Sequence, residues 1–192
     1  MTAFEAVVLA AGAGVRFGGG KLLAPWRGGL LIEAALTSAF AAPVRAVTVV
    51  TGADASAIAA AARAFDPRVR IVHAADHAEG MGASLRCAIA SLPEDTEAVF
   101  VFLGDMPRVP PAVLGPLAQA VRAGAPAAAP MFAGRRGNPV VLARALFPQI
   151  LALTGDAGAR DILRRPDSAL ALVEASDDGV LFDVDQPGDL AR

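Results

Sequence analysis

Three side chains have the types and positions that phosphoryl chemistry requires. Arg16 and Lys21 lie five residues apart in the glycine-rich stretch LAAGAGVRFGGGK, and Asp105 follows AVFVFLG, the most strand-like run of the chain. An arginine binds phosphate oxygens through two N–H groups, whereas a lysine acts as a point charge. A carboxylate at the end of a parallel strand is well placed to bind Mg²⁺ together with phosphate oxygens. These residues predict a site for a triphosphate, with Asp105 as a candidate metal ligand.

The glycine-rich stretch matches neither of two common nucleotide-binding templates. A P-loop needs Gly, four residues and then Gly-Lys-Ser/Thr, but leucine follows Lys21 and Val15 stands where the first glycine belongs. The dinucleotide fingerprint Gly-x-Gly-x-x-Gly fits Gly12 and Gly14 and fails at Phe17. What remains is a glycine turn at a strand end, whose backbone N–H groups can approach a phosphate chain closely. The alternative is a flexible loop with two solvated cations.

Apolar runs typical of buried strands alternate with runs of helical spacing. Continuously apolar strands indicate a parallel sheet covered on both faces, and their alternation with helices indicates βαβ units. We predict an α/β protein, with one domain over residues 1–192 and a three-layer α/β/α sandwich around a mostly parallel, Rossmann-like sheet. Predicted strands are 6–11, 46–52, 69–74, 98–104, 169–175 and 179–184; predicted helices are 30–40, 55–65, 83–92 and 114–123; 138–153 holds a strand and a helix, and 123–130 is a predicted loop.

Charge and composition argue against several functions. The 192 residues carry a net charge of −2, so no overall basic field attracts nucleic acid. A single cysteine, Cys87, excludes an intrachain disulfide and a cysteine-rich metal site. No basic leader and no apolar run long enough to cross a bilayer are visible, which predicts a cytoplasmic protein without a membrane partner.

Six motifs along the chain resemble those of one enzyme family. LAAGAGVRFGGGK resembles the LAAGxSxRMGxxK signature of MobA-like nucleotidyltransferases. The others follow in order: EGMGASL at 79–85, LGDMP at 103–107, RGNPVVL at 136–142, GDAGAR at 155–160 and DVDQPGDL at 183–190. Together they span nearly the whole chain, which is more specific than any single motif. Within the family the chain is most similar to the molybdenum cofactor cytidylyltransferases, which implies a fold of the nucleotide-diphospho-sugar transferase type.

The resemblance implies a reaction and a set of site residues. The reaction is Mg²⁺-dependent transfer of CMP from CTP to the terminal phosphate of the molybdenum cofactor, with release of pyrophosphate. Catalysis would fall to Arg16, Lys21 and Asp105, and Mg²⁺ binding to Asp105 and Asp185. The protein partner would be a molybdenum hydroxylase or its chaperone. Nucleotide binding would involve Leu9, Ala10, Ala11, Gly12, Ala13, Gly14, Arg16, Lys21, Gly82, Ser84, Gly104 and Asn138.

Ala11 carries the prediction of the base. In the resembled family, cytidylyltransferases read LAAG and guanylyltransferases LAGG, and a methyl group at Ala11 would crowd a purine more than a pyrimidine. The alternative of a related nucleotidyltransferase that uses GTP or UTP with another phosphorylated acceptor stays open. From other classes, a nucleotide- or flavin-binding oxidoreductase on the same fold is disfavoured by the failed dinucleotide template. A catalytically silent binding module is disfavoured by the retained charged residues.

Several residues have two interpretations. Asp105 has an alternative role in capping a turn or helix, and Ser84 either caps a helix or hydrogen-bonds the nucleotide. The roles of Asn138 and Asp156 are open. In the closing motif DVDQPGDL we expect only one of the two carboxylates Asp183 and Asp185 to face the site, and we choose Asp185.

That choice leaves Asp183 a structural or surface role. The motifs also depart from the family pattern at three positions, with Gly14 in place of Ser, Phe17 in place of Met and Gln186 in place of Thr. The substitution at Gln186 leaves the local geometry open. Trp26 is expected to pack under the glycine loop.

Overall fold

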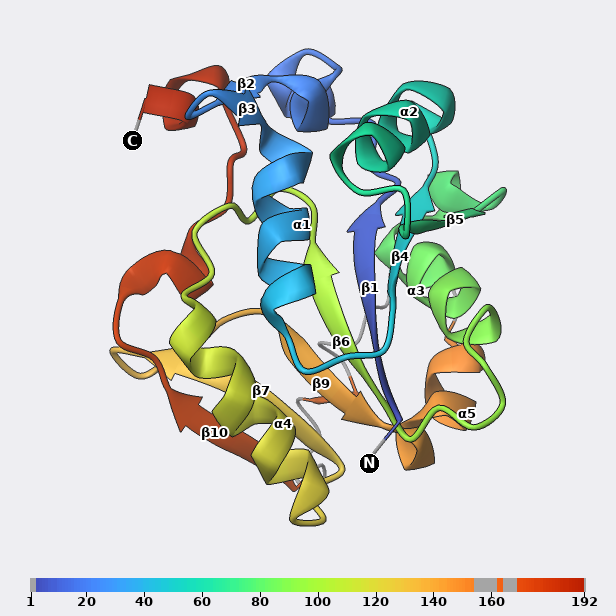
Figure 1. The fold of residues 1–192 in the computed structure, drawn as a ribbon, viewed down its shortest axis with the longest axis vertical. Helices are drawn as coiled ribbons and strands as arrows, with labels where there is room; N and C mark the ends of the chain where they lie inside the picture. Colours follow the sequence, from blue (N-terminus) through green and yellow to red (C-terminus); the bar gives the residue numbers. More distant parts are fainter. Residues whose placement is uncertain (1–2, 154–161, 164–168, 192) are drawn as a thin grey trace.

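The computed structural model describes residues 3–153, 162–163 and 169–191, and their arrangement is shown in Figure 1. Within these ranges the main sheet has the order β10-β7-β9-β6-β1-β4-β5, with β8 paired to β7. Strands β1, β4, β5 and β6 are parallel, whereas β9 runs antiparallel to β6 and β7. The strands are β1 (Phe4–Ala10), β4 (Val47–Thr51), β5 (Arg70–His73), β6 (Ala98–Leu103), β7 (Ala127–Phe132), β8 (Arg135–Arg136), β9 (Val140–Ala143) and β10 (Leu170–Glu174).

Helices cover both faces of this sheet. They are α1 (Leu31–Ala41), α2 (Ala55–Phe65), α3 (Met81–Ala90), α4 (Leu114–Arg122) and α5 (Phe147–Leu151). The helix expected over 55–65 occupies those residues, and the other helices begin and end within a few residues of their predicted bounds. In the described ranges, none of the helices has the length and apolarity that a membrane crossing requires.

Alternate residues of the central strands build two separate hydrophobic cores. In β1, Ala6 and Val8 face one core, which includes buried residues of α1, α2 and α4. Val7 and Leu9 face the other core, which α3 and α5 complete. Successive side chains of a strand point to opposite faces, so a strand that is apolar throughout must be covered twice. The predicted three-layer α/β/α sandwich is therefore confirmed.

Two predictions of local structure were wrong, both in the C-terminal half of the chain. The alanine- and proline-rich segment 123–130 was expected to be a loop, but β7 begins at Ala127 and lies between β10 and β9. Small side chains suit this fully buried position, where burial overrides the low strand propensity of alanine. Pro130 falls where the neighbour of β7 changes from β9 to β8, so the ladder is already interrupted there.

The second error concerns the expected strand 179–184. Residues Asp178–Leu181 form a short 3₁₀ helix, η6, and an extended segment without strand pairing follows. The N-terminus of η6 is capped by Asp177, whose side chain accepts a hydrogen bond of 2.8 Å from the Gly179 N–H. This local bond competes with strand formation.

Gly137 is expected to hold η6 against the sheet, and replacing it with alanine should destabilise the protein. The Asn138 N–H donates to the Val180 carbonyl at 2.9 Å, and a Cβ at residue 137 would overlap that carbonyl. We expect Gly137→Ala to lower the free energy of unfolding by about 2 kcal/mol through overpacking, measured by urea denaturation. Gly115→Ala is the control, because Gly115 lies in α4 with open space around it. An equal effect of both substitutions would contradict the prediction.

Candidate functional site

The candidate site lies at one end of the sheet, where segments from three parts of the chain meet. In Figure 1 the arrowheads of β1, β4 and β6 point to this end. The glycine loop of residues 11–20 follows β1, and Asp105 comes two residues after β6. Residues 182–191 return to the same end after η6. The sequence motifs that are farthest apart are therefore brought together.

Hydrogen bonds to a single carbonyl close the glycine loop, and three successive backbone N–H groups before it have no backbone acceptor in the described ranges. The Gly14 carbonyl accepts hydrogen bonds from the N–H groups of Phe17 at 2.9 Å and Gly19 at 3.2 Å. Among the described residues, the N–H groups of Gly12, Ala13 and Gly14 donate to no backbone carbonyl. Successive unpaired amides of this kind form an anion-binding concavity.

Gly14 departs from the family pattern for a geometric reason. Its backbone is left-handed with φ 59°, and a Cβ there would lie 3.0 Å from Cβ of Lys21. A serine at this position would be strained and would push Lys21 away. In this chain the glycine lets Lys21 approach closely.

Lys21 is the centre of the charged cluster. Its Nζ lies 2.6 Å from Oδ2 of Asp105 and 3.9 Å from Oδ1 of Asp185. The Lys21 and Asp105 side chains are 14% and 25% exposed, so their ion pair is partly shielded from water. Arg16, with an 83% exposed side chain, lies 3.8 Å from the second oxygen of Asp185. Arg16 is therefore exposed and loosely paired, whereas Lys21 is closely paired with Asp105.

Backbone contacts place Asp185 beside Asp105. The Val184 N–H donates to the Asp105 carbonyl at 3.0 Å, and Val184 is fully buried. The carboxylate of Asp189 accepts hydrogen bonds from the N–H groups of Asp185 at 3.0 Å and Gln186 at 2.9 Å. Asp189 thus fixes the turn that presents Asp185. The sequence holds a signal for this role, because Asp189 is an acid three residues after Gln186, and this spacing is typical of helix capping.

Asp183 stands two residues before Asp185, and its placement bears on the expectation that only one of the two carboxylates faces the site. Residues two apart on an extended chain point to the same side, and the buried Val184 between them points inward. Nearby protein atoms partly shield the Asp183 carboxyl, and the charges of Asp185 and Asp105 act on it as well, so its pKa is raised. Asp183 therefore lies within electrostatic reach of both candidate metal ligands.

The carboxylates fit a divalent cation that arrives with a nucleotide. In the described ranges, no three His, Cys, Asp or Glu side chains form a complete metal centre. Mg²⁺ needs only one or two carboxylates, because phosphates and water supply its other ligands. Asp105 and Asp185 share one cation, Lys21, and their hard oxygen donors suit Mg²⁺ or Mn²⁺.

Ala11 lies on the β4 side of the loop and is almost fully buried. Its carbonyl accepts a hydrogen bond from the Ala53 N–H at 3.2 Å, and a Cβ at Gly52 would overlap both this carbonyl and the ring of His77. Gly52 and His77 are therefore neighbours of Ala11 that the sequence motifs did not reveal. On the other side of β1, the Gly104 N–H donates to the Leu9 carbonyl at 3.0 Å.

The remaining predicted residues are placed less centrally. Ser84 is buried in the first turns of α3, whose N-cap is Gly80, so the capping interpretation of Ser84 was wrong. Gly82 lies in the same turn. Asn138 connects β8 to β9 and contributes the backbone bond to Val180 described above. Asp156 and the motif at 155–160 lie outside the described residues.

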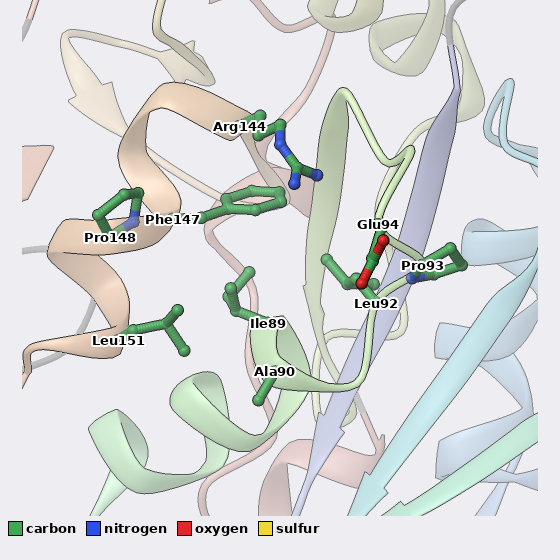
Figure 2. A pocket seen from close by; sticks show the side chains of 9 residues that line it. All are labelled: Ile89, Ala90, Leu92, Pro93, Glu94, Arg144, Phe147, Pro148 and Leu151. Carbon is green, nitrogen blue, oxygen red and sulfur yellow. The ribbon is translucent and has the colours of Figure 1, made fainter.

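An apolar pocket at the other end of the sheet is a poor candidate for this chemistry. It has a volume of about 320 Å³ between the end of α3 and α5, and Figure 2 shows mainly apolar side chains around it. Its one cation, Arg144, already donates to the Thr96 carbonyl at 3.0 Å. The pocket lies near the segment that precedes β6, whereas Asp105 follows β6. It therefore lies at the sheet end away from the charged cluster.

The fold defines an α/β protein with a charged cluster at the carboxyl ends of its central strands, and comparison with known proteins gives the class and the family. Residues 6–171 match the MobA-like NTP transferase domain, and the chain belongs to that family. Its fold is of the nucleotide-diphospho-sugar transferase type. The family makes the protein an enzyme, a nucleotidyltransferase.

Relatives of known name differ in what they do. The chain is 34% identical to nicotine blue oxidoreductase of Paenarthrobacter nicotinovorans, over 93% of this chain and 90% of that protein. It is 24% identical to molybdenum cofactor cytidylyltransferase of Escherichia coli K12, over 98% of this chain and 94% of that protein.

A solved structure is similar over the whole chain. Rv0371c of Mycobacterium tuberculosis H37Rv has a TM-score of 0.87 at 30% identity, covering 100% of this chain and 97% of that one. A second structure of Rv0371c is a complex with manganese, with a TM-score of 0.76 and 28% identity over 91% of this chain and 89% of that one.

Proposed function

We propose that this protein transfers CMP from CTP to the terminal phosphate of the molybdenum cofactor, releasing pyrophosphate in a Mg²⁺-dependent reaction. The observation that carries the proposal is the cluster of Lys21, Asp105 and Asp185 beside a loop with free amides. The similarity to the Escherichia coli cytidylyltransferase supports the choice of nucleotide and acceptor. We assign the activity to one domain over residues 1–192, acting in the cytoplasm and delivering its product to a molybdenum hydroxylase or its chaperone.

The residues would act mainly by position and charge. The free amides of Gly12, Ala13 and Gly14, together with Arg16, would bind the β- and γ-phosphates, and Lys21 would turn from Asp105 to the phosphate chain. Asp105 and Asp185 would hold Mg²⁺, which when bound supplies neutralisation of the phosphate charge. Phosphoryl transfer leaves little covalent chemistry to the protein, so in-line alignment and electrostatics set the rate.

Pyrophosphate release tests the proposal directly. The purified protein would be incubated with Mg²⁺ and each of the four NTPs, with and without molybdenum cofactor. We expect release with CTP that depends on the cofactor, and a cytosine dinucleotide product by mass spectrometry. Release with GTP or UTP, or with another phosphorylated acceptor only, would move the proposal to a different branch of the family.

Replacing Ala11 with glycine should relax the preference for the base. The methyl group of Ala11 packs near Gly52 at the end of β1, and its removal would create room for a larger ring. We expect the ratio of kcat/KM for CTP over GTP to fall by about tenfold, the effect of one methyl-sized contact. Competition kinetics with both nucleotides would measure it, with Ala13→Gly as the control. An unchanged ratio would remove Ala11 from base selection.

An oxidoreductase is the second candidate, because the relative at 34% identity bears that name. The glycine loop lacks the third glycine of the dinucleotide fingerprint, which disfavours a nicotinamide or flavin dinucleotide. Binding of NADPH, NADH and FAD by calorimetry separates the candidates. Tight dinucleotide binding without pyrophosphate release from any NTP would favour the oxidoreductase.

A further inference from the structure

A cavity beside the carboxylate cluster has features of a binding site that the nucleotide does not need. It has a volume of about 460 Å³ and lies between the β7–β8 hairpin and η6, which are neighbours in Figure 1. This volume is typical of small-molecule sites. The lining residues are Phe132, Ala133, Arg135, Asp178, Leu181, Phe182 and Asp183. Asp183 lines the cavity, and the next residue, Val184, donates its N–H to the Asp105 carbonyl at 3.0 Å, so the cavity adjoins the proposed site of phosphoryl transfer.

Arg135 is a cation of this cavity without a carboxylate partner among the residues that the structure describes. Asp178 is already paired with Arg108 at 2.8 Å, so its charge is neutralised locally. Arg135 lies on the exposed strand β8 and forms no ion pair with a carboxylate in the described ranges. An arginine fork that faces a cavity without a protein partner suits an anionic group of a ligand.

One wall of the cavity is mainly aromatic and is held by packing against the first hydrophobic core. Phe132, Leu181 and Phe182 are partly buried and pack against the first hydrophobic core. The Phe182 ring lies 6.1 Å from the ring of Trp26, and the Arg108 guanidinium stacks over it at 4.6 Å. A preformed aromatic wall next to an arginine that has no carboxylate partner in the described ranges favours a ligand that combines a flat ring with a negative charge.

We propose that this cavity is the acceptor subsite, with Arg135 as the residue that binds an anionic group of a ring-bearing, phosphorylated acceptor. The inference rests on the proposed function. An acceptor seated here would approach from the side of Asp183, and its phosphate oxygen would attack the α-phosphorus of CTP. One P–O bond then forms to the acceptor as the bond to the leaving pyrophosphate breaks, so the step needs no further reactant.

Binding without nucleotide tests the subsite independently of turnover. Molybdopterin would be titrated anaerobically into the NTP-free protein by calorimetry. We expect saturable binding by the wild type, binding at least about tenfold weaker in Arg135→Ala, as for loss of a charge-assisted contact, and partial recovery in Arg135→Lys. Arg63→Ala is the matched control, because Arg63 is an exposed arginine of α2 near the opposite edge of the sheet. Equal affinities in all four proteins would overturn the inference.

Kinetics separate this inference from the proposed function. In Arg135→Ala we expect KM for the acceptor to rise at least about tenfold, because the lost contact would bind the acceptor equally in the ground state and the transition state. KM for CTP should be unchanged. If the wild type transfers CMP and Arg135→Ala has an unchanged acceptor KM, the subsite is wrong and the proposed function stands. If the wild type transfers no CMP to molybdopterin, the proposed function fails, and the calorimetric comparison still decides whether Arg135 binds this ligand.

Discussion

Replacing Asp105 with alanine is expected to lower kcat for pyrophosphate release by about 10³-fold, because a metal ion supplies several kcal/mol of charge stabilisation in such reactions. Asp105 offers the metal a carboxylate that is 25% exposed, at the end of β6. The fold should survive, because the hydrogen bond that ties down the closing segment goes to the Asp105 carbonyl. Thermal unfolding of the variant would check this, and we expect a loss of about 1 kcal/mol from the ion pair with Lys21.

Two further variants show whether the charge of Asp105 is responsible. Asp105→Asn keeps the shape and removes the charge, and it should be nearly as inactive as the alanine variant. Asp54→Ala is the matched control, since Asp54 is an exposed acid that follows β4 at the same end of the sheet. Wild-type rates in Asp105→Asn would exclude Asp105 as a metal ligand.

Replacing Lys21 with methionine is expected to have two opposite effects. Loss of the cation should lower kcat/KM for CTP by about 10²-fold, the cost of removing one preorganised charge contact to a transferring group. In the nucleotide-free protein, Mn²⁺ should instead bind about fivefold more tightly, because Lys21 no longer competes for Asp105 and Asp185. Electron paramagnetic resonance of free Mn²⁺ measures the second effect without any turnover.

The matched control for Lys21 is Arg27→Met. Arg27 is a cation in the turn between the short strands β2 (Pro25–Trp26) and β3 (Gly29–Leu30), where it stacks on the Trp26 ring at 5.3 Å. Its removal should change neither CTP kinetics nor Mn²⁺ affinity. If Lys21→Met weakens Mn²⁺ binding, the lysine and the metal do not compete, and the proposed exchange of Lys21 from carboxylate to phosphate is wrong.

The local pattern of hydrophobic residues was sufficient to predict the central strands. It failed where burial or helix capping determines the secondary structure. The strand at β6 is apolar on both faces, so its place in the sheet could be predicted from its own residues. The strand β7 is built of alanines and a proline, and only its position between β10 and β9 makes it a strand. Residues 179–184 have strand-like composition, but the cap at Asp177 turns their first part into a 3₁₀ helix.

The closing segment shows why a motif does not give its own geometry. The letters DVDQPGDL do not show that Val184 is buried, and this burial turns Asp183 and Asp185 to the same side. Nor do they show that Asp189 holds the backbone of Asp185. Both features depend on packing against segments that are distant in the sequence.

By itself, the sequence determined the α/β class and which residues stand at strand ends, because hydrophobic periodicity and glycine content are local properties. It also supplied the glycine loop, Arg16, Lys21 and Asp105 as candidates. Only the tertiary structure decided that Lys21 bonds to Asp105 across 84 positions, and that Arg135 faces a cavity beside Asp183. Such distances follow from strand register and helix packing over the whole sheet, and these are set by contacts between residues far apart in the chain.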